Sequence, residues 1–137
     1  MIDELKNIEY VLFDLDGTVS DSSEGITKSA DKALKSEGID VPFETLTSFI
    51  GPSLRVSFGR YTDDVEKRDR MLDVYRERYS EKGWCENKIY PGMAELLRDL
   101  QKSGKHVVLA SAKPEYFCRK IIKYFGVEQY FDFIGGS

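Results

Sequence analysis

Apolar residues along the 137-residue chain follow two patterns, a short continuous one and a helical one. Short β-branched and aromatic runs predict buried strands at 8–13, 105–110 and 130–134. Apolar residues at helical spacing predict one helix over about 93–100 and another from Pro114 to Phe125. Strands that alternate with helices of this length favour a parallel sheet with right-handed crossovers.

The segment between the first predicted strand and the rest has only helical spacing. Asp21 and Glu24 form a capping-box pattern, which predicts a helix that begins there and stops at Gly38. Further helices are predicted over 42–50, after the Gly51-Pro52 break, and over 65–83.

The fold class that follows is α/β. We expect an incomplete, Rossmann-like parallel-sheet core made of residues 1–20 and 86–137. An all-helical domain, residues 21–85, is inserted into this core after its first strand.

Charge and composition exclude several classes of protein. The chain has 24 acidic and 20 basic residues, and the basic ones are scattered, so neither the net charge of −4 nor its distribution favours nucleic acid. No apolar run approaches the roughly 18 residues of a membrane helix, and the first residues do not resemble a signal peptide. Cys85 and Cys118 lack a CxxC pattern and suit a reducing cytoplasm, although two cysteines can also form one disulfide. We expect the single histidine, His106, to be structural or exposed.

Two aspartates, Asp14 and Asp16, stand at the end of the first predicted strand. Ligands of open parallel sheets bind at this end of the strands, and two close carboxylates are readily held by Mg²⁺. One carboxylate can attack phosphorus, and its neighbour can protonate the leaving oxygen and later deprotonate water. Gly17 permits a sharp turn that brings amide groups toward phosphoryl oxygens. Ser111, the amides beside it and Lys113, after the second strand, can hold the phosphate from the other side.

Several stretches together resemble the haloacid dehalogenase superfamily. FDLDGTV, followed by an Asp-Ser helix start, is similar to its first motif, and LASAKP at 109–114 is similar to its second. FIGPSLRVSF at 49–58 and YPGM at 90–93 resemble the phosphoglycolate-phosphatase branch, in which a helical cap follows the first motif.

The resemblance implies a role for each matching residue. Asp14 is the nucleophile and a Mg²⁺ ligand, and Asp16 is the general acid/base whose carbonyl also binds the metal. Ser111 binds phosphate, and Arg55 reaches the substrate from the cap. The remaining expected substrate contacts are Gly17, Ala112 and Lys113. The activity implied is Mg²⁺-dependent hydrolysis of a small phosphomonoester, such as phosphoglycolate, a sugar phosphate, a nucleotide or pyrophosphate.

Each role has a simpler alternative. The two aspartates can form a turn, although a calcium loop would need one more aspartate before the glycine. Ser111 can be a helix N-cap, Lys113 a solvated loop cation, and Arg55 one half of a surface ion pair. Asp21 is interpreted as a helix cap without chemistry.

The sequence departs from the family in one respect. Members carry a lysine after the third strand and an acidic pair after the fourth, whereas this sequence stops at IGGS, residues 134–137. We therefore expect a truncated chain with an incomplete Mg²⁺ site and with its first strand at the sheet edge. Such an edge predicts low stability or a homo-oligomer. The alternatives to a phosphatase are a binding or oligomerising fragment and a phosphomutase of the same superfamily.

Overall fold

The computed structural model describes residues 7–137, which divide into two compact units. One is an α/β unit made of 7–21 and 88–137, and the other is a helical unit made of 22–87. Within the described residues, no helix is both long and apolar enough to cross a membrane.

The α/β unit contains a parallel sheet with the strand order β1-β4-β5. Its strands are β1 (Tyr10–Phe13), β4 (His106–Ala110) and β5 (Phe133–Gly135). The predicted strands are present but shorter at their starts, and Tyr130, the predicted start of the third strand, instead ends a 3₁₀ turn, η4 (Glu128–Tyr130). The Asp132 amide donates to the Val107 carbonyl at 2.8 Å, so the chain aligns with β4 only from this point.

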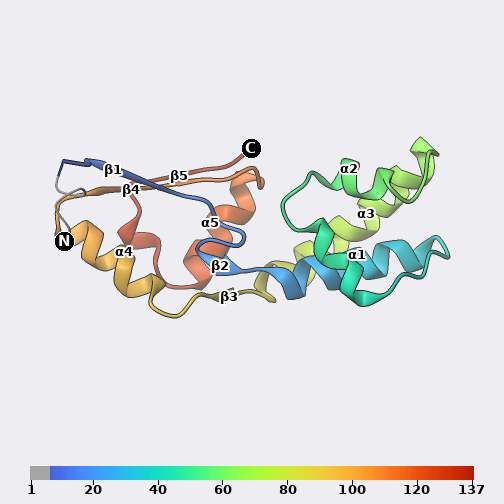
Figure 1. Ribbon diagram of the computed structural model, residues 1–137, viewed down its shortest axis with the longest axis horizontal. Coiled ribbons are helices and arrows are strands. Elements are labelled where there is room, and N and C mark those ends of the chain that lie inside the picture. The colour runs from blue at the N-terminus through green and yellow to red at the C-terminus, as the bar shows by residue number, and fades with distance from the viewer. Residues whose placement is uncertain (1–6) are drawn as a thin grey trace. The chain divides into compact units, whose positions relative to one another are not determined.

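Two helices, α4 (Met93–Lys102) and α5 (Glu115–Tyr124), cover one face of this sheet (Figure 1). Because strand residues alternate between faces, every second side chain points toward these helices. The buried strand residues on this face are Phe13, Val107, Leu109 and Ile134. The helices contribute Leu97, Leu100, Cys118, Ile121 and Ile122 at the three- and four-residue spacing of a buried stripe.

The opposite face of the sheet is exposed. Tyr10, Leu12 and Phe133 are 58%, 66% and 59% exposed, and no other described element of this unit lies over them (Figure 1). Strand β1 is also at the edge of the sheet, as predicted. The α/β unit is therefore covered on one side only.

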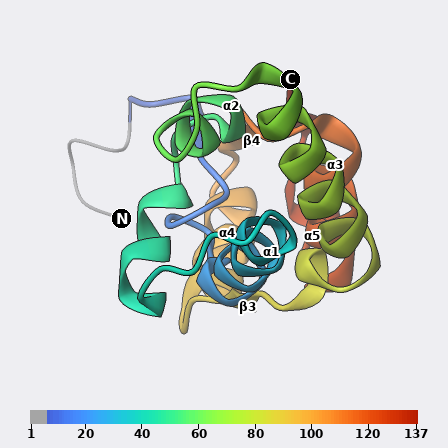
Figure 2. The ribbon, with the colours of Figure 1, turned by 90° about the vertical axis from the view of Figure 1, so that its right-hand side faces the viewer.

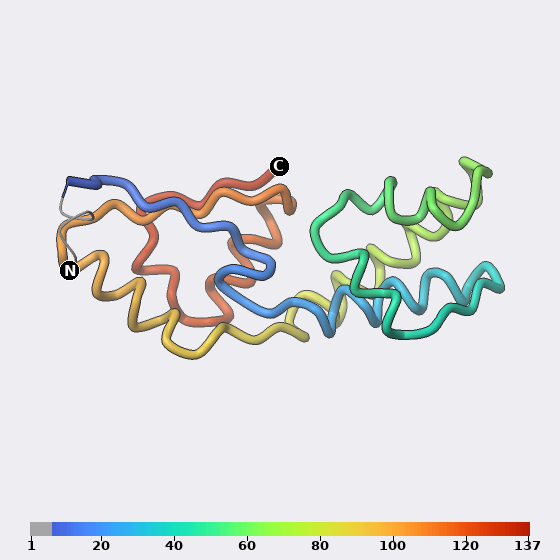
Figure 3. The backbone as a smooth tube through the Cα atoms, in the orientation of Figure 1, coloured from blue at the N-terminus to red at the C-terminus, as the bar shows by residue number. Residues whose placement is uncertain are grey.

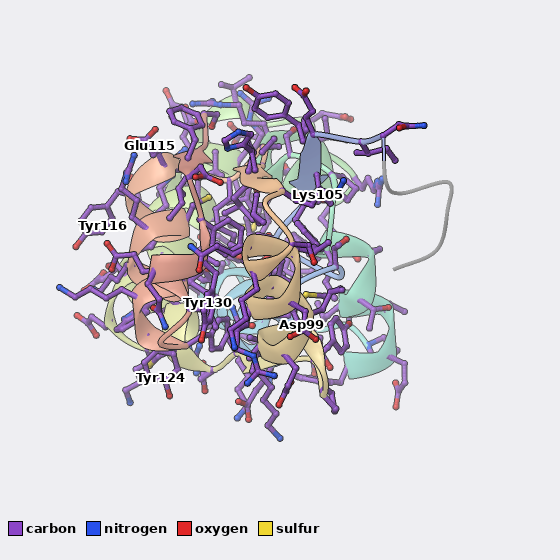
Figure 4. The ribbon with its side chains drawn as sticks, turned by 90° about the vertical axis from the view of Figure 1, so that its left-hand side faces the viewer. Asp99, Lys105, Glu115, Tyr116, Tyr124 and Tyr130 are labelled. Atoms are coloured by element: carbon purple, nitrogen blue, oxygen red, sulfur yellow. The ribbon has the colours of Figure 1, made fainter. Side chains whose placement is uncertain are left out.

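The outer side of α5 carries aromatic residues as well. Tyr116 and Tyr124 project from it into solvent, whereas Tyr130 lies between α4 and α5 (Figure 4). The half-exposed His106 stacks on Tyr10 and lies 3.7 Å from Asp132, as expected for a structural or exposed histidine.

A two-stranded antiparallel ribbon, which the sequence did not predict, pairs β2 (Ser20–Asp21) with β3 (Lys88–Ile89) (Figure 3). Asp21 lies opposite Lys88 in this ribbon, one residue before the N-cap position of the helix that follows. The helix begins only after the ribbon, with Ser22 in the N-cap position and no cap hydrogen bond from its side chain.

The helical unit consists of three α-helices and two 3₁₀ turns among its described residues. They are α1 (Ser23–Ser36), η2 (Phe43–Phe49), α2 (Leu54–Gly59), α3 (Val65–Glu81) and η3 (Gly83–Cys85). The helix predicted over 42–50 is thus a 3₁₀ turn. Figure 2 looks nearly along α1, which packs against α3. The core of the helical unit is aromatic: Phe58 contacts Phe49 and Tyr75 edge to face, with ring centroids 4.9 and 6.1 Å apart.

Candidate active site

The two aspartates follow β1 in a tight turn. Leu15, between them, is fully buried, and its carbonyl accepts from the amides of residues 18–20. Asp14 is exposed, and its Oδ1 accepts from the Leu15 amide at 2.8 Å. The buried Leu15 therefore anchors the turn, and the two carboxylates sit on either side of this anchor.

Gly17 has the left-handed conformation that favours glycine, with φ at 80°. Its amide donates to the Ser20 carbonyl at 2.8 Å, so this N–H closes the turn. A contact between the Gly17 amide and phosphate stays a prediction.

Strand β4 brings the second group of predicted residues to the same end of the sheet. Phe13 of β1 lies opposite Leu109 of β4, so Asp14 and the segment 111–113 follow neighbouring strands at the same end of the sheet. Ser111 and Lys113 are partly buried and Ala112 is exposed. The Ser111 Oγ accepts from the Lys113 amide at 3.1 Å, which holds the segment as a compact turn.

An ion pair joins the two segments. Lys113 Nζ lies 3.3 Å from Asp16 Oδ2, and these side chains are only 9% and 19% exposed. Lys113 is therefore not a solvated loop cation. The other carboxylate oxygen, Asp16 Oδ1, is buried and has no hydrogen-bond partner within the described part of the chain. A buried carboxylate oxygen without a donor is costly, which makes it a candidate contact for a ligand or cation.

The thiol of Cys118, on α5, lies behind this cluster. Burial raises its pKa more than the Ser111 hydrogen bond and the Lys113 charge lower it, and the charges of Asp16 and Asp14 raise it further. The strand register brings Asp14 and Ser111 to the same end of the sheet, and the Cys118 thiol contacts the Lys113 carbonyl there at 3.5 Å. The only local signal for placing Cys118 here is its position on the buried side of α5.

The residues present fit half of a Mg²⁺ site. The Asp14 carboxylate and the Asp16 backbone carbonyl, the two ligands that the resemblance implies, are hard oxygen donors, which suit this ion. No group of three or more His, Cys, Asp or Glu residues within 7–137 could hold a metal. The Lys113 ammonium, moreover, already neutralises part of the charge that would attract one.

Arg55 lies in the helical unit, on α2, and is exposed. Its Nη1 lies 3.4 Å from Asp69 Oδ1 of α3, in a surface ion pair. This pair is the simpler alternative that the sequence left open, and a substrate contact by Arg55 stays a prediction.

A hollow of about 490 Å³ in the α/β unit lies beside β5 and contains none of the predicted site residues. Its lining is Arg119, Glu128, Gln129, Phe131, Asp132, Phe133 and Ile134. The two carboxylates, the Lys113 ammonium and the Ser111 hydroxyl lie instead at the ends of β1 and β4. We therefore identify the candidate site by its reactive groups and not by the largest hollow described.

Known proteins resemble this chain over nearly all of its length. The 5'-nucleotidase of Pseudomonas aeruginosa is 40% identical over 93% of this chain and 58% of its own length. The tyrosine-protein kinase PtkA of Mycobacterium tuberculosis is 37% identical over 94% of this chain and 44% of its own. A phosphoglycolate phosphatase of Aquifex aeolicus is 32% identical over 95% of this chain and 61% of its own. The chain therefore spans about half of the curated relatives it matches.

Solved structures agree with this result. The crystal structure of a Clostridium difficile protein assigned as a phosphatase has a TM-score of 0.88 and 45% identity. It is matched over 96% of this chain and 61% of that protein. The family model for haloacid dehalogenase-like hydrolases matches residues 11–137, which include every predicted site residue. The chain belongs to the haloacid dehalogenase-like hydrolase family.

Proposed function

We propose that this site hydrolyses a small phosphomonoester through an aspartyl-phosphate intermediate, with Mg²⁺ as cofactor. The observation that carries the proposal is the convergence of two carboxylates, a buried cation and a serine hydroxyl at the carboxyl ends of β1 and β4. The phosphatase relatives support the reaction class. The two free cysteines, Cys85 and Cys118, suit the reducing cytoplasm where we expect this reaction.

In the first step, an Asp14 oxygen attacks phosphorus and the ester P–O bond breaks. Asp16 gives its proton to the departing oxygen, which leaves as an alcohol. Ser111, Ala112 and Lys113 hold the phosphoryl oxygens, and Lys113 balances negative charge beside Asp16. Mg²⁺, held by the Asp14 carboxylate and the Asp16 backbone carbonyl, would supply further positive charge next to the transferring group.

In the second step, water attacks phosphorus and gives its proton to the Asp16 carboxylate. The bond between phosphorus and the Asp14 oxygen breaks, which releases inorganic phosphate and restores both aspartates. Water as acceptor makes the site a phosphatase, whereas a sugar hydroxyl in the same place would make it a phosphomutase.

The test is hydrolysis of p-nitrophenyl phosphate with Mg²⁺ and with EDTA. Because residues 7–137 supply only part of a metal site, we expect slow, Mg²⁺-stimulated turnover, well below the rate of about 1 per second common for enzymes. Asp14→Asn should reduce this rate about 1,000-fold or to background, since the amide is a far weaker nucleophile. The control is Asp99→Asn, on the exposed surface of α4 (Figure 4), which should leave the rate unchanged. Undiminished turnover by Asp14→Asn contradicts the proposed nucleophile.

A second candidate function is that of a self-associating module. Among the described residues of the α/β unit, one face of the sheet is uncovered and β1 forms its edge. Both features favour self-association, because an identical edge on a second copy can extend the sheet. The two functions differ in a simple way: the first depends on Asp14, and the second depends on Leu12 and its neighbours on the exposed face.

A further inference from the structure

The last three residues of the sequence run alongside the turn that follows β4. The Ser111 amide donates to the Gly135 carbonyl at 3.1 Å, and the Ser137 amide donates to the Lys113 carbonyl at 3.0 Å. The Glu115 amide donates to the Ser137 carbonyl at 3.3 Å. Figure 4 shows Glu115 at the start of α5, so this segment holds the turn between β4 and α5 along its whole length.

Gly136 is the residue of closest approach. A Cβ added there would lie 2.5 Å from the Lys113 carbonyl oxygen and 2.6 Å from the Glu115 nitrogen and Cα. These are backbone atoms, so they can move only if the turn moves. A side chain at position 136 would therefore push residues 113–115 away from the strand end.

Its neighbour Gly135 has a different environment. A Cβ there would lie 2.9 Å from the Phe133 ring, which is 59% exposed and free to rotate, and 3.6 Å from the Leu109 carbonyl oxygen. The two adjacent glycines thus form a matched pair: an added side chain would collide with the backbone of the turn at Gly136 but not at Gly135.

The turn that Gly136 touches carries candidate phosphate contacts. Lys113 donates its amide to Ser111 Oγ and places its Nζ against Asp16. Cys118 Sγ lies 3.5 Å from the Lys113 carbonyl, the same carbonyl that accepts from Ser137. A shift of this carbonyl would move the Lys113 side chain relative to Asp16 and change the direction of the Ser111 hydroxyl.

We infer that Gly136 is a positioning residue for phosphate binding: its missing side chain lets the strand end fix Ser111 and Lys113 in place. The inference rests on the proposed function, because it assumes that phosphate binds at these two residues. Gly136 would then affect phosphate binding without contacting either phosphate or metal.

The experiment compares Gly136→Ala with Gly135→Ala in the full chain. Inorganic phosphate is titrated while amide shifts of residues 111–113 are followed by NMR, and amide exchange is measured at Glu115 and Ser137. For Gly136→Ala we expect at least tenfold weaker phosphate binding and at least tenfold faster exchange at these two amides. Exchange at the core amide of Leu109 should be unchanged in both variants. Gly135→Ala should stay within about twofold of the parent in binding.

Phosphate binding by Gly136→Ala within about twofold of the parent overturns the inference, and so does an equal loss in Gly135→Ala. If Gly136→Ala does not fold, Ser137→Pro takes its place, because it removes the amide that donates to Lys113 without adding a side chain at position 136. It should show the same weakened binding, and normal binding would count against the inference. If the parent itself fails to bind phosphate, the proposed function is wrong. The amide exchange then still decides whether Gly136 fixes the turn.

Discussion

The helical unit and the α/β unit bury their apolar side chains in different ways. The helical unit buries its apolar side chains in one central core, in which Phe58, Leu46 and Met71 are fully buried. Single apolar residues are exposed on its surface. The sheet of the α/β unit is covered on one face and leaves large apolar residues exposed on the other. Both proposed catalytic carboxylates belong to the half-covered unit. The chemistry is therefore carried by the unit whose sheet is buried on one face only.

The helical unit also contains a very close backbone contact, between α1 and η3. The Gly25 amide donates to the Glu86 carbonyl at 3.1 Å, and α1 passes directly over Gly83. A Cβ at Gly25 would lie 1.9 Å from the Gly83 carbonyl oxygen. No neighbouring side chain can relieve this overlap, since the opposing atoms are backbone.

The largest expected effect is that of Gly25→Ala, which should destabilise the helical unit by about 3 kcal/mol or more, because α1 must move away from η3. Urea unfolding followed by fluorescence of Trp84, the single tryptophan, reports on this unit. Gly59→Ala is the control: a Cβ there meets no atom within 4 Å, so it should be neutral or stabilise by up to about 1 kcal/mol. Equal unfolding midpoints for the two variants would show that the helical unit is not packed tightly at this contact.

A smaller effect is expected on the uncovered sheet face. If the edge and face of β1 bring two copies together, Leu12→Lys should weaken self-association at least tenfold, which is about 1.4 kcal/mol. Analytical ultracentrifugation over a range of concentrations measures this change. The control is Tyr116→Lys on the outer side of α5, because Tyr116 and Leu12 are both 66% exposed. A monomeric parent, or an equal response of the two variants, contradicts self-association through β1.

The sequence predicted the order of the main elements because each had a clear period. The strand around Leu12 and the helix around Leu97 have patterns that local sequence alone creates. The β2–β3 ribbon was missed because each strand has two residues, too few for any period, and its partners are far apart in the chain. The same ribbon sets where the helix begins, because Asp21 pairs with Lys88 and Ser22 takes the N-cap position.

The candidate site was predictable in its residues but not in their connections. Asp14, Asp16 and Ser111 were recognisable because each follows an apolar strand. The ion pair between Lys113 and Asp16 joins residues almost a hundred positions apart, so no local pattern reveals it. No local pattern marks Gly136, and only the distance from a Cβ at this position to the Lys113 carbonyl shows what it contacts.

A part-buried ion pair gives the helical unit an acid-sensitive contact. Arg78 donates to both carboxylate oxygens of Glu86, at 2.7 and 3.2 Å, and also to Ser29. The hydrogen bonds from Arg78 lower the pKa of Glu86, burial raises it less, and the charges of Arg78 and Lys28 lower it further. Because the folded-state pKa lies below the unfolded value of 4.5, the pair stabilises the fold above about pH 4.5. This stabilisation is lost as the pH falls through the folded-state value.

The smallest expected effect is therefore that of Glu86→Gln, which should destabilise the helical unit by about 1 kcal/mol at pH 7 and by less at pH 3. Trp84 fluorescence in urea at the two pH values measures it on the same unit as Gly25→Ala. Glu24→Gln is the matched control, because its exposed pair with Lys28, at 3.1 Å, should contribute little at either pH. A destabilisation by Glu86→Gln that is the same at both pH values would mean that its carboxylate charge does not stabilise this unit. The stability of the helical unit would then rest on the Gly25–Gly83 contact and the core around Phe58, and not on this ion pair.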